Sequence, residues 1–67
     1  MIAALRRARE DAGLTQEEVT RRLRTYASFI SKIESRERRL DVVELSALCK
    51  LYGVALDDFL RQAELLD

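Results

Sequence analysis

Few side chains in this sequence are of the kinds that perform covalent or metal chemistry. There is no histidine and Cys49 is the only cysteine, so a disulfide within one chain is impossible and the usual zinc sites lack ligands. Asp57 and Asp58 are adjacent carboxylates, but they stand where a helix is expected to begin, and there they favour the positive end of its dipole. The sequence therefore predicts a protein that is not an enzyme and uses no metal or cofactor, with Cys49 as a small buried residue.

The chemistry that remains is electrostatic. The net charge is zero, with 12 Lys and Arg against 12 Asp and Glu. Residues 1–39 carry ten of these bases against six acids, whereas residues 40–67 carry two against six, which gives +4 and −4. A chain divided in this way suits a protein that turns one face to phosphates, although solvated helices are also often uneven in charge.

Apolar residues recur at helical spacing and predict one all-α domain over residues 1–67. Thr15 with Glu18, and Asp41 with Glu44, have the spacing of capping boxes, and Gly13 and Gly53 stand where left-handed helix ends are wanted. We expect helices over about 2–12, 16–23, 27–34 and 42–52, and a fifth from about 56. The residues expected to face inward are Ile2, Leu5, Ala8, Arg9, Val19, Leu23, Ile30, Ile33, Val42, Leu45, Leu48, Cys49, Tyr52, Val54, Leu56, Phe59, Leu60, Ala63 and Leu66.

A chain of 67 residues buries only about 60% of its unfolded surface, and short domains commonly gain stability by self-association. The leucines near the C-terminus exceed what so small a core can hold, which indicates a subunit interface. We expect it on the last helix and the end of the one before, at Leu51, Leu60, Ala63 and Leu66. A monomer with frayed C-terminal residues is the alternative. The sequence has no apolar run long enough for a signal peptide or membrane span, so a cytoplasmic protein is expected.

The two short helices over 16–23 and 27–34, joined by Arg24, Thr25 and Tyr26, describe a helix-turn-helix. Around them, LTQEEV, SFISKIE and LYGVALDDFL resemble the phage Cro and repressor-type (Xre-like) helix-turn-helix family, over about Leu5 to Leu60. The resemblance implies a five-helix repressor-like fold and a homodimer. It also implies a transcriptional regulator, of repressor or controller type, that binds an approximately palindromic operator in double-stranded DNA.

The resemblance also implies roles for individual residues. Helix 27–34 would enter the major groove, with Ala27, Ser28 and Lys32 at positions that read base edges; lysine can donate to guanine O6 and N7. Contacts to the DNA backbone are implied for Gln16, Thr25, Tyr26, Arg36, Arg38 and Arg39. Two alternatives stay open: the three arginines pair with Glu34 and Glu37 on the surface, and Tyr26 and Phe29 cover the core rather than touch DNA.

The chain departs from the family at four positions. Arg24 and Arg36 stand where glycine is usual; if the backbone there is left-handed, each costs roughly 1 kcal/mol but adds a positive charge close to the DNA. Thr20 replaces an alanine and is tolerable if its hydroxyl bonds to a carbonyl of the preceding turn. Ala27 replaces a frequent glutamine, which puts the target sequence in doubt. A protein-interaction module or an antitoxin with a toxin partner is the rival function.

Overall fold

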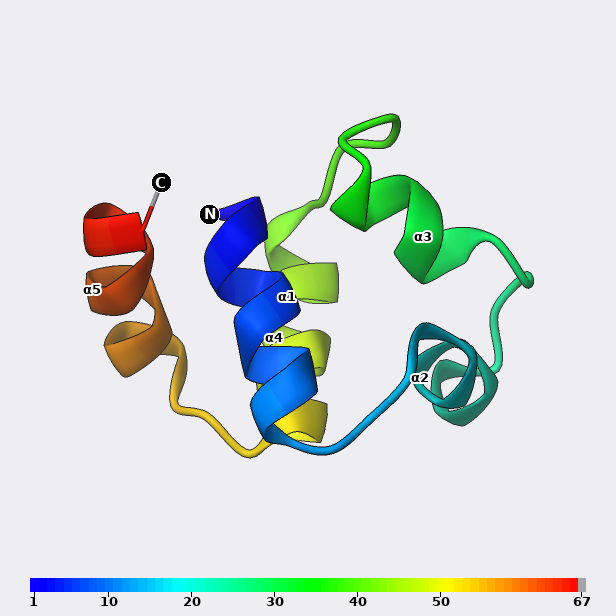
Figure 1. Cartoon of the computed structure of the whole chain (residues 1–67), viewed down its shortest axis with the longest axis horizontal. Coiled ribbons are helices and arrows are strands. Elements are labelled where there is room, and N and C mark those ends of the chain that lie inside the picture. The colour runs from blue at the N-terminus through cyan, green and yellow to red at the C-terminus, as the bar shows by residue number, and fades with distance from the viewer. Residues whose placement is uncertain (67) are drawn as a thin grey trace.

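The computed structural model describes the backbone of residues 1–66 and the side chains of residues 1–64, and all regular structure in that range is helical. The helices are α1 (Ile2–Asp11), α2 (Gln16–Leu23), α3 (Phe29–Glu34), α4 (Val42–Tyr52) and α5 (Leu56–Leu66). Helix α1 contacts α3, α4 and α5, while α2 packs on α3 (Figure 1). The predicted all-α fold of five helices is confirmed. No helix among the described residues is long and apolar enough to cross a membrane.

Local capping residues set where α2 and α4 begin. The Thr15 hydroxyl accepts from the Glu18 N–H at 3.1 Å, and the Asp41 carboxylate accepts from the Glu44 N–H at 2.7 Å. Each glutamate in turn accepts from the N–H of its capping partner, so both predicted capping boxes are complete. Because these contacts are local in sequence, the predicted starts at residues 16 and 42 are confirmed.

Helix α3 is shorter than the sequence predicted. It begins at Phe29, and Ala27 and Ser28 belong to the preceding turn. The Phe29 N–H donates to the Tyr26 carbonyl three residues back, at 3.0 Å, and Ser28 makes no side-chain cap. The expected start at Ala27 is wrong because this tighter turn, rather than an α-helical one, joins α2 to α3.

The core lies where the five helices meet. Most of the predicted inward residues are buried. The buried hydrophobic residues of the core are Ala4, Leu5, Ala8, Val19, Phe29, Ile30, Ile33, Leu45, Leu48, Cys49, Tyr52, Phe59 and Ala63. Val42 was predicted to face inward and is 69% exposed. A helical side chain leans over the turn before it, and Val42, as the first residue of α4, has no such turn to cover. Leu60 is also partly exposed, at 41%.

Thr20 is a local defect in this core. Its side chain is buried, yet its hydroxyl has no hydrogen-bond partner. The expectation that the hydroxyl bonds to a carbonyl of the preceding turn is therefore wrong. A buried hydroxyl without a partner costs about 1–3 kcal/mol.

Replacing Thr20 with valine should raise the free energy of unfolding by about 1–2 kcal/mol, because valine keeps the branched shape and removes the unpaired hydroxyl. Urea denaturation followed by circular dichroism measures the change. Thr15→Val is the matched control and should lose about 1 kcal/mol, since the Thr15 hydroxyl caps α2. Destabilisation by Thr20→Val would show that its hydroxyl has a partner.

Candidate nucleic-acid interface

Helix α3 has one buried face and one exposed face. Ile30 and Ile33 are 1% and 0% exposed and pack into the core. On the other side Lys32 is exposed, while Ser28 and Ser31 are half-buried. The Ser31 hydroxyl donates to the Ser28 carbonyl at 3.0 Å, which holds the turn before α3 against its first turn. The predicted facing of Ile30, Ile33 and Lys32 is confirmed.

A buried ion pair fixes α3 to α1. Arg9 donates through Nε and Nη2 to the two carboxylate oxygens of Glu34, at 2.7 and 3.1 Å. The side chains are only 9% and 4% exposed. The hydrogen bond that Arg9 donates to Glu34 raises the pKa of Arg9 further above its already high value. The two parallel hydrogen bonds tie the C-terminal end of α3 to α1.

Two further bonds extend this pair to α2. Arg9 Nη1 donates to the Leu14 carbonyl at 2.8 Å, and Gln16 Nε2 donates to Glu34 Oε1 at 3.0 Å. The alternative that placed Glu34 on the surface beside the connector arginines is therefore wrong. A buried ion pair at Arg9 could have been predicted from the sequence. Arg9 lies on the apolar stripe of its helix, and a buried arginine requires a carboxylate partner.

Arg38 holds the α3–α4 connection against both helices. Its guanidinium lies 4.8 Å from the centre of the Phe29 ring and donates to both carboxylate oxygens of Glu44, at 2.8 and 2.7 Å. The hydrogen bonds from Arg38 lower the pKa of Glu44 below its usual range. Glu44 is thus shared between the α4 capping box and Arg38. Arg38 is occupied within the protein, whereas Arg39 beside it is exposed.

The turn between α2 and α3 presents an aromatic ring and a left-handed arginine. Phe29 is buried, and Tyr26, 49% exposed, meets it edge to face with 5.5 Å between ring centres. Phe29 therefore covers the core, as one alternative expected, while Tyr26 faces solvent.

Arg24 and Arg36 have φ angles of 56° and 66°. The backbone is therefore left-handed at both positions where glycine is usual in the family. Thr25 is half-buried and Ala27 exposed.

The residues expected at a subunit interface are placed unequally. Leu60 is 41% exposed and lines a shallow hollow with Met1, Ala63 and Glu64. Leu51 is half-buried, and Ala63, at 7% exposed, already packs in the core. Leu66 lies outside the described side chains. Among the predicted interface residues whose side chains are described, Leu60 therefore has the most accessible apolar surface.

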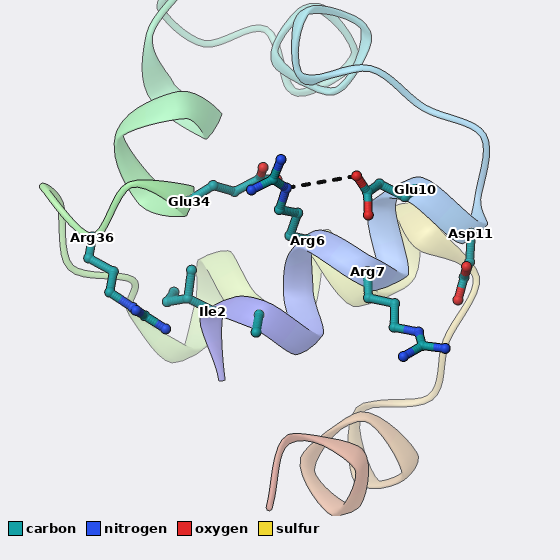
Figure 2. A pocket seen from close by; sticks show the side chains of 8 residues that line it. Ile2, Arg6, Arg7, Glu10, Asp11, Glu34 and Arg36 are labelled. Atoms are coloured by element: carbon teal, nitrogen blue, oxygen red, sulfur yellow. Dashed lines mark ion pairs between the residues drawn. The ribbon is translucent and has the colours of Figure 1, made fainter. Parts of the chain in front are cut away.

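A second hollow lies along the outer side of α1, with a volume of about 530 Å³. Figure 2 shows Arg6, Arg7, Glu10 and Asp11 lining it from α1, with the Arg6–Glu10 pair at 3.8 Å, while Glu34 and Arg36 face it from the other side. Its lining holds three arginines and three acids, so the charges balance. This hollow lacks the net charge that would attract an anion.

The amino-acid sequence matches the model of a known protein family. A family model described as a helix-turn-helix domain matches residues 3–62. No curated protein and no solved structure matches the chain.

Proposed function

Since this chain belongs to the Cro/repressor-type (Xre-like) helix-turn-helix family, we propose that it regulates transcription by binding a specific sequence in double-stranded DNA, inside the cell. The observation that carries the proposal is the exposed outer face of α3, held rigidly from behind by the Arg9–Glu34–Gln16 cluster. A helix of this diameter fits the major groove, where each base pair presents a distinct set of donors, acceptors and methyl groups.

We assign Lys32 as the direct reader of a base edge, with Ser28 and Ala27 in the turn before α3 as close neighbours of the bases. Lys32 is exposed, and the structure gives its side chain no ion-pair partner among the described residues. Its ammonium is therefore available to guanine O6 and N7. Ala27 offers only a methyl group, which suits contact with the methyl group of thymine.

Gln16 has two tasks in this proposal. A glutamine amide has two N–H donors, and the contact to Glu34 uses one of them. The second is free for a phosphate oxygen at the start of α2, where the helix dipole also favours an anion. Thr25, Tyr26, Arg36 and Arg39 are the further candidates for the DNA backbone. Arg38 contributes by shaping the connection, because both of its terminal nitrogens already donate to Glu44.

The protein as proposed acts as a homodimer. A two-fold contact through α5 and the end of α4 sets two copies of α3 about 34–36 Å apart, which is one turn of duplex. The operator is then approximately palindromic. Selection of bound duplexes from a random pool tests this directly, because a palindrome with half-sites one turn apart should emerge. A pool that shows no enrichment would refute sequence-specific binding.

Lys32→Ala should weaken binding to the selected operator by about 1–3 kcal/mol and relax the preference at one base position in each half-site. The measurement is a set of titrations with the operator and its single-base variants. Lys50→Ala removes an exposed lysine from the end of α4 and should leave the operator affinity and the base preference unchanged. An equal loss on every duplex would reject Lys32 as a base reader and leave it a phosphate contact.

One feature favours a protein-binding role as the second candidate. Val43 is 74% exposed beside an apolar hollow lined by Leu23, Phe29 and Ala47, and such a surface suits an apolar side chain of a toxin or other protein partner. Salt dependence separates the two roles. Duplex affinity falls steeply with added salt because counterions are released, whereas an apolar protein contact responds weakly.

A further inference from the structure

Four helices of this protein end with the same backbone geometry. After each, one residue is left-handed and the next donates its N–H to the carbonyl five residues back, which is the Schellman arrangement. The left-handed residues are Gly13 (φ 73°), Arg24 (56°), Arg36 (66°) and Gly53 (74°). The bonds join Leu14 to Arg9, Thr25 to Thr20, Glu37 to Lys32 and Val54 to Cys49, at 3.2, 3.3, 2.9 and 3.0 Å.

Two of these four ends carry glycine and two carry arginine. A side chain added at Gly13 or Gly53 would meet no atom within 4 Å, so crowding does not explain the glycines. Glycine is favoured there because the backbone is left-handed, a conformation that brings the Cβ of any other residue too close to the following carbonyl oxygen. Arg24 and Arg36 bear that steric cost at positions where glycine would avoid it, and a strained residue that persists indicates a use for its side chain.

The arginines and the glycines lie at different places in the fold. Figure 1 shows that the two connections carrying arginine, α2–α3 and α3–α4, lie at the two ends of α3. The connections carrying glycine, α1–α2 and α4–α5, lie along the lower edge of the same view. A helix in the major groove has a phosphate strand on each side of it. The two connections that carry arginine are therefore the ones next to α3, where those phosphate strands would lie.

We propose that Arg24 and Arg36 contact the phosphates of the two DNA strands that border α3, and that arginine is kept at these two left-handed positions for that contact. The inference rests on the proposed function and adds Arg24 to the DNA-facing residues. Arg24 is exposed, and the structure gives it no salt bridge among the described residues. Arg36 is exposed and its side chain extends toward Ile2 (Figure 2), so it reaches a phosphate by rotating its side chain while its backbone stays in place.

Arg24→Gly and Arg36→Gly test the pair, because each should make the protein more stable and a weaker DNA binder at once. Relief of the left-handed backbone should raise the midpoint of thermal unfolding by about 4–8 °C. Loss of one phosphate contact should reduce the slope of log affinity against log salt by about 0.9. Between 50 and 200 mM salt, each variant should then lose about 3- to 4-fold less affinity than the parent.

Three variants separate the charge from the backbone. Arg24→Lys keeps both the charge and the strain, so its salt slope and unfolding midpoint should match the parent. Arg24→Asn should behave as the glycine variant does, with a smaller gain in midpoint, because asparagine tolerates the left-handed region. Gly53→Arg places a charge and a strained residue far from α3, and it should lower the midpoint by about 4–8 °C without steepening the salt slope.

The possible results distinguish this inference from the proposed function. A parent protein with no salt-dependent affinity for duplex DNA would refute the function itself. A parent that binds duplex with the expected salt slope, together with an Arg24→Gly variant of the same slope, would overturn the phosphate contact alone. If Arg24→Gly leaves the unfolding midpoint unchanged or lowers it, the left-handed backbone at residue 24 does not destabilise the parent protein.

Discussion

Replacing Arg9 with methionine is expected to lower the free energy of unfolding by about 3–5 kcal/mol. The change leaves the Glu34 carboxylate, only 4% exposed, without its cation. It also removes the donor to the Leu14 carbonyl, which closes the end of α1. Since small domains are stable by about 5–15 kcal/mol in total, the variant should unfold at a much lower urea concentration or be largely unfolded without urea.

Two further variants show whether burial is the cause. Arg6→Met breaks an exposed ion pair with Glu10, in which the side chains are 63% and 56% exposed, and should cost about 0–1 kcal/mol. The double variant Arg9→Met with Glu34→Leu removes both charges and should recover much of the loss, because apolar residues of similar volume replace buried ion pairs well. An Arg9→Met variant no less stable than Arg6→Met would contradict the view that this pair anchors α3.

The starts of α2 and α4 were predictable from local capping signals, whereas the start of α3 was not. Thr15 with Glu18 and Asp41 with Glu44 fixed the starts of α2 and α4 through contacts three residues apart. Helix α3 has no side-chain cap, and it begins after a tight turn that is closed by the Phe29 N–H and the Tyr26 carbonyl. The exposure of Val42 was missed for a related reason, since helical periodicity does not say which turn of a helix lies beyond its neighbours.

The candidate site likewise contains some features that the sequence predicts and others that it does not. Lys32 on the outer face of α3 follows from helical periodicity, because Ile30 and Ile33 must face the core. The partners of Arg9 and Arg38 lie 25 and six residues away in sequence, and nothing local selects Glu34 and Glu44 among the many acids. The left-handed positions of Arg24 and Arg36 were predictable only from the family pattern of glycines.

Replacing Leu60 with glutamate is expected to lower affinity for a full palindromic operator by about 10²- to 10⁴-fold. Leu60 is 41% exposed and lines the hollow with Met1 and Ala63, so a charge there should leave the monomer folded. In the proposed dimer the same carboxylate would meet its symmetry mate across the two-fold axis, where apolar surface is needed. Two half-sites would then be bound independently, and the gain from tethering one α3 to the other would be lost.

Sedimentation velocity and titrations on whole and half operators measure the two parts of this expectation. The parent should sediment as a dimer and lose most of its affinity when one half-site is scrambled, whereas Leu60→Glu should sediment as a monomer and bind both duplexes alike. Val43→Glu adds the same charge at the exposed start of α4, 74% exposed, and should behave as the parent does. If Leu60→Glu binds the whole operator as tightly as the parent, the α5 contact is not the dimer interface. If Val43→Glu alone separates the subunits, the interface lies instead at the start of α4, beside the apolar hollow next to α2.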